Sequence, residues 1–198
     1  MKKSNSPLWI LVVLTSLIFV SSCIGSQKNK IKQLEDNIAL LKEQSIPVRF
    51  KIIEKSNDSI QLVVKFYNAD NKEINKLEQK MHGAELSFDF YVVPVKDRYV
   101  AFPSKIFTDK IAANDGIILY DYYNKENYPE IFNSKEMNPE LYEGLKGVFV
   151  KIQSGQLDSL TDHFGNMVHD IKEFKSFLPG NVYSIVTHTK GGIEIIEE

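Results

Sequence analysis

Hydrophobic and polar residues alternate over two consecutive stretches, residues 48–54 (VRFKIIE) and 60–67 (IQLVVKFY). Every second side chain of a β-strand points to the same face, so this period of two predicts two strands that each bury one face. The turn-forming residues 56–59 (SNDS) separate the stretches, as they would in a β-hairpin. We expect the buried face of this hairpin to consist of Val48, Phe50, Ile52, Ile60, Leu62, Val64 and Phe66.

Three further stretches have the composition of strands: residues 85–93 (ELSFDFYVV), 98–107 (RYVAFPSKIF) and 116–123 (GIILYDYY). Strands at this spacing, without helices between them, are typical of an antiparallel β-sandwich of immunoglobulin-like type. The sequence therefore predicts such a sandwich over about residues 46–153. In the first stretch we expect the apolar side chains to point inward and the polar ones outward, with Leu86, Phe88, Phe90 and Val92 inside and Ser87 and Asp89 outside.

The C-terminal part adds a helix to the predicted sheets. After a predicted strand at residues 147–153, apolar residues recur at helical spacing over residues 156–178 and predict one amphipathic helix. Residues 179–180 (PG) end this helix, and two final strands flank the turn residues Lys190-Gly191-Gly192 as a hairpin. The predicted class is therefore α+β, mainly antiparallel β-sandwich, with residues 46–198 forming a single globular domain.

The N-terminal residues have the pattern of an export signal. Lys2 and Lys3 precede an apolar run of thirteen residues from Leu8 to Val20. A helix that crosses a membrane needs about 20 apolar residues, so this run is too short. A basic start followed by a short apolar run is typical of a signal peptide.

The end of this signal contains the only cysteine of the chain, Cys23. The residues Val20-Ser21-Ser22-Cys23 resemble the lipobox of bacterial lipoproteins. That resemblance implies a signal peptide over residues 1–22, cleavage before Cys23, and a lipid anchor in which the Cys23 sulfur carries a diacylglycerol as a thioether and the Cys23 amine carries an acyl chain such as palmitate. Ile24 follows the cysteine and no acidic run comes after it, which by the same resemblance indicates an outer-membrane protein that faces the periplasm.

Lipidation of Cys23 would leave the mature chain without a thiol, and therefore without disulfides or thiolate metal sites. About 150 residues remain for the domain, enough to bury roughly 70% of the surface of the unfolded chain. Removal of residues 1–22 takes away two lysines, so the formal net charge of −2 becomes −4. This charge, without a basic patch, argues against binding to nucleic acid.

Residues 23–45 are predicted to form the lipid anchor and a helical spacer. Ile31, Leu34, Ile38 and Leu41 follow the 3-4-3 spacing of a coiled coil, and Pro47 would end the helix. Two interpretations remain open: a stalk that self-associates weakly through residues 31–41, or an amphipathic helix that folds back on the domain.

No motif in the chain indicates catalysis. The sequence lacks the G-x-S-x-G, S-x-x-K and G-x-G-x-x-G patterns. We therefore expect no catalytic residue, no metal and no cofactor, although a hydrolase site assembled from distant residues stays open. The first functional hypothesis is an accessory lipoprotein that docks a protein partner in the cell envelope.

A tyrosine-rich segment supports an alternative. Tyr122, Tyr123 and Tyr128 lie where a predicted strand passes into a loop, and aromatic rings on loops suit the binding of a glycan or another small ligand. For this hypothesis we expect Tyr123 and Tyr128 to be partly exposed and Tyr120 to be buried. The competing interpretation is that the cluster packs in the core.

Two short segments resemble the O-glycosylation motif of Bacteroidetes, in which Asp and Ser or Thr precede an apolar residue. They are Asp58-Ser59-Ile60 and Asp158-Ser159-Leu160. By this resemblance Ser59 and Ser159 would be glycosylation sites, with Ser59 the more accessible because it lies in a predicted turn.

Overall fold

The hairpin predicted from the alternating pattern is present. The computed structural model describes residues 44–95, 98–135, 137–156, 164–169 and 177–198. In it, β1 (Gln44–Lys55) pairs antiparallel with β2 (Ser59–Tyr67), with Phe50 opposite Val64. All seven side chains that the pattern assigned to the buried face are at most 2% exposed.

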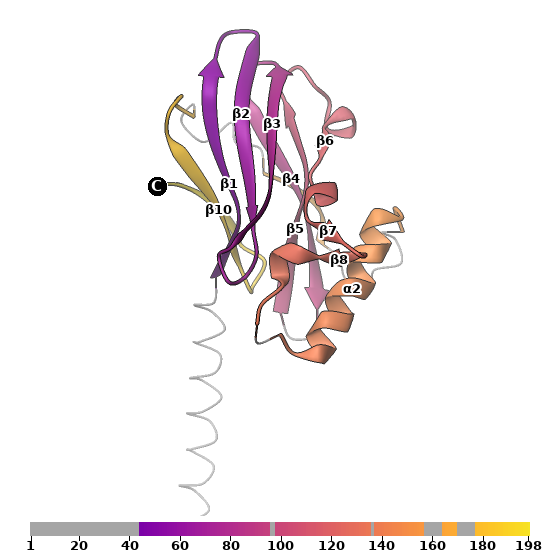
Figure 1. Cartoon of the computed structure of the whole chain (residues 1–198). Coiled ribbons are helices and arrows are strands. Elements are labelled where there is room, and N and C mark those ends of the chain that lie inside the picture. Colours follow the sequence, from indigo (N-terminus) through magenta and orange to yellow (C-terminus); the bar gives the residue numbers. More distant parts are fainter. Residues whose placement is uncertain (1–43, 96–97, 136, 157–163, 170–176) are drawn as a thin grey trace, which may run out of the picture. The chain divides into compact units, whose positions relative to one another are not determined.

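Two antiparallel sheets contain most of the strands (Figure 1). The first has the order β11-β10-β1-β2-β3, so the C-terminal hairpin joins the N-terminal one, and the second has the order β6-β5-β4-β9. The strands not yet bounded are β3 (Glu73–His82), β4 (Leu86–Val95), β5 (Arg98–Thr108), β6 (Ile117–Ile118), β9 (Phe164–His169), β10 (Val182–His188) and β11 (Ile193–Glu197).

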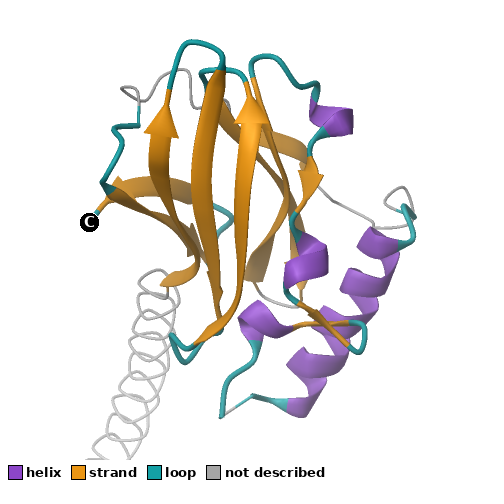
Figure 2. Cartoon of the chain, turned by 45° about the horizontal axis from the view of Figure 1, so that its top comes forward, coloured by secondary structure: helices purple, strands orange, loops and turns teal. Residues whose placement is uncertain are grey.

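Short elements and one α-helix complete the described chain. A small two-stranded sheet pairs β7 with β8, and three 3-10 turns lie between β5 and α2. Figure 2 shows these turns and α2 gathered on one side of the strands. The bounds are η1 (Ala113–Asp115), η2 (Tyr120–Tyr122), β7 (Asn124–Lys125), β8 (Tyr128–Pro129), η3 (Glu130–Phe132) and α2 (Pro139–Gln153).

Aromatic side chains connect the layers. The ring centroids of Phe50 in β1 and Phe88 in β4 lie 5.0 Å apart, which links the first sheet to the second. On its other side the second sheet contacts α2, because Phe102 in β5 stacks on Phe149 in α2 at 6.1 Å. The second sheet therefore buries both of its faces.

This double burial makes one sequence prediction wrong. Ser87 and Asp89 were expected to point to solvent, but they are only 8% and 3% exposed. Alternation correctly placed them on the face opposite Phe88 and Phe90, but it could not show that a second layer covers that face.

The helix is not where the periodicity placed it. Residues 147–153, predicted as a strand, form the second half of α2. The Asn138 side chain caps this helix by accepting a hydrogen bond from the Glu140 backbone N–H at 2.9 Å, and Pro139 occupies the first turn, where its missing N–H costs nothing. Leu145, Phe149 and Ile152 then form its buried stripe.

The helix predicted over residues 156–178 is wrong in its centre. Residues Phe164–His169 form β9, which pairs antiparallel with β4 and places Val168 opposite Asp89. Pairing with the neighbouring strand satisfies backbone groups of β4 and outweighs the local helical period. The flanking residues 157–163 and 170–176 lie outside the described residues.

Three boundaries also differ from the predictions. The strand expected at residues 116–123 is only two residues long, because the chain turns into η2 at Tyr120. β3 was not predicted, since only Leu77 and Met81 among its ten residues are buried. Gln44 and Ser45, assigned to the spacer, belong to β1, and the rest of the predicted spacer lies outside the described residues.

Candidate functional site

The tyrosine cluster does not have the predicted exposure. Tyr123 and Tyr128 are 1% and 2% exposed, whereas Tyr120 is only partly buried. All three exposure predictions are therefore wrong. Tyr122 is also partly buried, with its ring stacked on Phe66 at 5.7 Å.

Packing explains the burial of Tyr123. Its ring lies between Phe66 of the first sheet and Phe149 of α2, with centroid distances of 5.9 and 5.7 Å. Its hydroxyl donates a buried hydrogen bond of 2.7 Å to the Pro103 carbonyl oxygen. Burial raises the pKa of Tyr123 well above its ordinary value, so the phenol stays protonated as a donor.

Tyr128 is buried in a different way. Its ring stacks on Tyr142 of α2 at 4.2 Å with an interplanar angle of 12°. Its hydroxyl oxygen has no hydrogen-bond partner among the described residues. Tyr123 and Tyr128 therefore support the packing interpretation of the cluster, because neither ring is available on the surface.

Tyr122 lines a polar cleft of about 580 Å³ between the β2–β3 turn and β7. The cleft carries both charges, and Lys125 lies 3.5 Å from the Glu130 carboxylate. Its charged lining residues are Asp70, Lys72, Glu73, Lys125, Glu130 and Lys135. Because positive and negative groups are balanced, the cleft does not favour a ligand of either charge.

The other predicted sites are only partly described. Cys23 and Ser159 lie outside the described residues. Ser59 begins β2, is partly exposed, and its hydroxyl lies 3.2 Å from the Ser56 hydroxyl in a shallow cleft beside the hairpin turn. Neither its exposure nor its contact with Ser56 tests whether Ser59 is glycosylated, so O-glycosylation at Ser59 stays a prediction.

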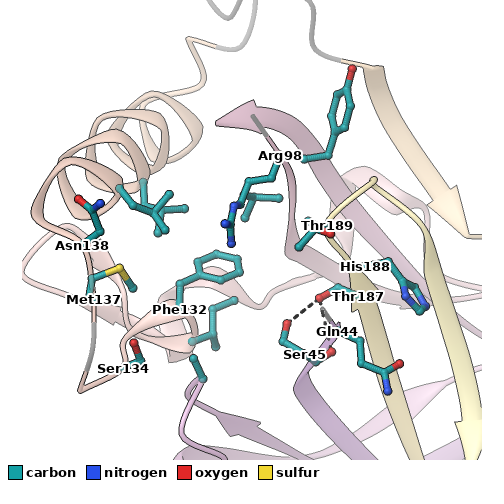
Figure 3. Close-up of a pocket in the computed structure, with 17 residues that line it drawn as sticks. Gln44, Ser45, Arg98, Phe132, Ser134, Met137, Asn138, Thr187, His188 and Thr189 are labelled. Atoms are coloured by element: carbon teal, nitrogen blue, oxygen red, sulfur yellow. Dashed lines mark hydrogen bonds between the residues drawn. The ribbon is translucent and has the colours of Figure 1, made fainter. Parts of the chain in front are cut away.

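A more enclosed cavity, of about 410 Å³, lies between the start of β5, the first half of α2 and the end of β10 (Figure 3). We call it the β5–α2 pocket. Its volume is within the range of 300–1,000 Å³ that is typical of small-molecule sites. Its wall is largely apolar, with the side chains of Val100, Ile131, Phe132, Met137, Leu141 and Leu145.

The fold positions this apolar wall from three directions. Leu141 and Leu145 lie one helical turn apart on α2, and the Asn138 cap fixes where that helix begins. Phe132 ends η3 and packs edge-on against Phe102 of β5 at 5.1 Å. Leu145 is buried, whereas Phe132 and Leu141 are only partly buried and so form the accessible part of the wall.

Polar groups occupy the opposite side of the pocket. The hydroxyls of Ser45 in β1 and Thr187 in β10 are hydrogen-bonded at 2.8 Å. The Tyr99 backbone N–H donates to the Thr189 carbonyl oxygen at 2.7 Å and ties the start of β5 to the β10–β11 turn. Figure 3 shows the Arg98 side chain directed toward Phe132 and the His188 ring directed away from it.

These polar groups do not form a nucleophile–base pair. The Ser45 hydroxyl bonds to another hydroxyl, and the His188 Nε2 lies 3.5 Å from the Glu194 carboxylate. Within the described ranges, no group of three or more His, Cys, Asp or Glu residues is arranged to hold a metal ion. What the pocket offers is therefore an apolar wall with hydroxyls and one guanidinium, which suits binding of a small molecule.

Sequence reasoning missed most of this pocket. One segment of the sequence, Asn138-Pro139-Glu140, does indicate the start of a helix, because it has a capping residue followed by proline at the first helical position. That segment locates α2 and, through Leu141 and Leu145, the wall of the pocket. No sequence pattern indicated that Arg98 would line the pocket, because its position depends on the packing of β5 beside β10.

In comparisons with known proteins, no protein-family model, curated protein or solved structure matches the chain. Among the described residues, no helix is long and apolar enough to cross a membrane.

Proposed function

We propose that the protein is a lipid-anchored, non-catalytic binding protein of the bacterial cell envelope, and that it binds a small apolar ligand in the β5–α2 pocket. The anchor is the predicted lipid on Cys23, which becomes the first residue of the mature chain when residues 1–22 are removed. The expected location is the outer membrane, facing the periplasm.

One observation carries the binding proposal: a cavity of about 410 Å³ whose accessible wall is apolar. Apolar surface in contact with water costs about 25 cal/mol of free energy for each Å². A ligand that covers Phe132, Met137 and Leu141 removes this cost and gains binding free energy. The tyrosine cluster is not part of this proposal, because Tyr123 and Tyr128 are buried.

We further infer that the two sheets form a sandwich of immunoglobulin-like type. The Phe50–Phe88 contact and the buried residues of both sheets support face-to-face packing. An experimental structure tests it: aligned sheets would cross at about −30°, whereas a crossing near 90° would contradict it.

Methionine methyl groups allow the pocket to be tested in the full mature chain. Met137 lines the pocket, whereas Met81 is buried in β3 outside the pocket wall. We would label the methionine methyls with ¹³C, place the lipidated protein in lipid nanodiscs, and titrate decanol and decanoate by NMR. The proposal predicts that at least one compound shifts the Met137 methyl signal saturably and leaves Met81 unchanged.

A matched pair of variants on α2 controls this experiment. Leu141→Trp adds bulk to the pocket wall and should abolish the shift. Val150→Trp introduces the same side chain nine residues later, which is half a turn around the helix from Leu141, at a side chain that is 43% exposed. A Met137 signal that responds to neither compound, or equally in both variants, would overturn the proposed function.

A further inference from the structure

The structure points to the chemical class of this ligand: we propose that the β5–α2 pocket binds a single-chain amphiphile with a carboxylate head. This inference rests on the proposed function and adds the head group. The alkyl chain would lie on the apolar wall, and the carboxylate would bind the Arg98 guanidinium.

Arg98 supplies the charge that selects the head group. Of the described residues that line the pocket, it is the only one with a permanent charge. Its side chain is partly buried and extends toward Phe132, at the border between the polar and apolar sides (Figure 3). A charge held beside apolar surface interacts more strongly with an opposite charge than it would in water.

Guanidinium geometry favours a carboxylate. Arginine presents five N–H donors in a planar fork, and two of them can bind the two oxygens of a carboxylate in parallel. Because there are five donors, this contact is compatible with an interaction that Arg98 already makes within the protein. The same charge disfavours a cationic head group.

Contacts to both sheets hold the backbone at Arg98 in place. Arg98 opens β5 and pairs with Val95 at the end of β4. The neighbouring hydrogen bond from the Tyr99 N–H to the Thr189 carbonyl oxygen attaches this corner to the β10–β11 hairpin. Both sheets therefore hold the backbone from which the guanidinium extends, which lowers the entropy cost of binding.

The apolar wall determines the other half of the ligand. Phe132, Met137 and Leu141 are partly buried and line the same cavity, and Ile131 and Leu145, which are buried, also line it. Such a surface fits an alkyl chain, whose methylene groups each contribute about 0.8 kcal/mol when they leave water. A free sugar would leave this wall uncovered.

The test compares head groups on one alkyl chain. Decanoate, decanol and decyltrimethylammonium share the chain and differ in charge, and at pH 8.5 decanoate is ionised. We would follow the Met137 methyl signal of the mature lipidated protein in nanodiscs at equal lipid concentration. The inference predicts that decanoate binds about tenfold more tightly than decanol, and that the cation binds most weakly.

The two arginines of the chain provide a matched pair of variants. Arg98→Gln should bring decanoate to within about threefold of decanol. Arg49→Gln removes an arginine that pairs with Glu198 at 2.7 Å, away from the pocket wall, and should keep the full preference. An unchanged Met81 signal shows that each variant is folded.

The outcomes separate the two proposals. If the wild-type protein binds decanol as tightly as decanoate, or if Arg98→Gln keeps the preference, the inference about the head group is wrong while the pocket remains a binding site. If none of the three compounds shifts Met137, the proposed function itself fails.

Discussion

Tyr123 and Tyr128 are both buried, and they differ in what their hydroxyl groups contact. The Tyr123 hydroxyl bonds to the Pro103 carbonyl oxygen, whereas the Tyr128 hydroxyl has no partner among the described residues. We predict that Tyr123→Phe lowers the free energy of unfolding by about 1 kcal/mol, and that Tyr128→Phe leaves it unchanged or raises it. Chemical denaturation of both variants measures the difference, and equal losses would contradict these contacts.

Asp89 gives a second prediction at this scale. It is 3% exposed, and its Oδ1 atom has no hydrogen-bond partner among the described residues. Desolvation raises the pKa of its carboxyl group above 3.8, although the Phe90 backbone N–H and the Lys105 charge act in the opposite direction. Between pH 3.8 and the raised pKa, the folded protein binds more protons than the unfolded chain. Stability therefore falls as the pH rises through this window.

Asp89→Asn removes this titration. We predict that the unfolding free energy of the wild type declines relative to that of the variant from about pH 4 upward, by at most about 1.4 kcal/mol per pH unit, and that the difference then levels off. Denaturant titrations of both proteins from pH 3 to pH 8 measure it. A wild type that gains stability over the variant as the pH rises would contradict the desolvation of Asp89.

At the level of elements, α2 contains two interior glycines with different surroundings. A Cβ atom at Gly147 would meet no atom within 4 Å, whereas one at Gly144 would lie 3.3 Å from a Val95 methyl. Alanine is a better helix former than glycine by about 1 kcal/mol. We therefore predict that Gly147→Ala raises the unfolding free energy by about 0.5–1 kcal/mol and that Gly144→Ala raises it less, as measured by thermal unfolding. A loss of stability in Gly147→Ala would contradict the helix.

A helix or strand could be predicted where neighbouring residues in the sequence determine it, and was missed where distant residues do. The two hairpins were predicted correctly, because alternation and turn residues such as Lys190-Gly191-Gly192 are local features of the sequence. β9 was missed because its strand conformation depends on pairing with the distant β4, and its apolar residues also fit a helix. β3 was missed because it is an edge strand with a mostly charged surface.

The candidate site was harder to predict than the fold. The tyrosines were expected on a surface because the segment 116–123 was expected to be a strand, and the turn at η2 instead directs Tyr123 into the core. The β5–α2 pocket combines residues from β1, β5, α2 and β10, and two of them, Ser45 and Thr187, are 142 positions apart in the sequence. Residues so far apart form no short sequence pattern from which their proximity in the fold could be predicted.

For the whole molecule, the first prediction concerns the anchor. Cys23→Ser removes the only sulfur that can carry the predicted lipid. We expect this variant to accumulate as an unprocessed precursor without lipid, as measured by mass spectrometry of membrane and soluble fractions. Normal processing and normal membrane fractionation of the variant would contradict the lipoprotein prediction.

A protein partner in the envelope remains the second prediction at this scale. The large exposed hydrophobic side chains of the described residues, Ile53, Val150, Leu178 and Ile196, come from different parts of the chain. Crosslinking of the lipidated protein in its own envelope tests docking. A single crosslinked species that persists in Leu141→Trp would indicate a partner surface separate from the pocket, and no crosslinked species would contradict docking.

The identity of the molecule that the β5–α2 pocket binds in its own membrane would decide whether the protein carries an alkyl carboxylate. The lipidated wild type and the Leu141→Trp variant would be purified in parallel from the native envelope, and the small molecules released from each would be identified by mass spectrometry. We expect a monocarboxylate with an alkyl chain, bound to the wild type and strongly depleted in the variant. The same molecules in the same amounts on both proteins would show that the β5–α2 pocket is not their binding site.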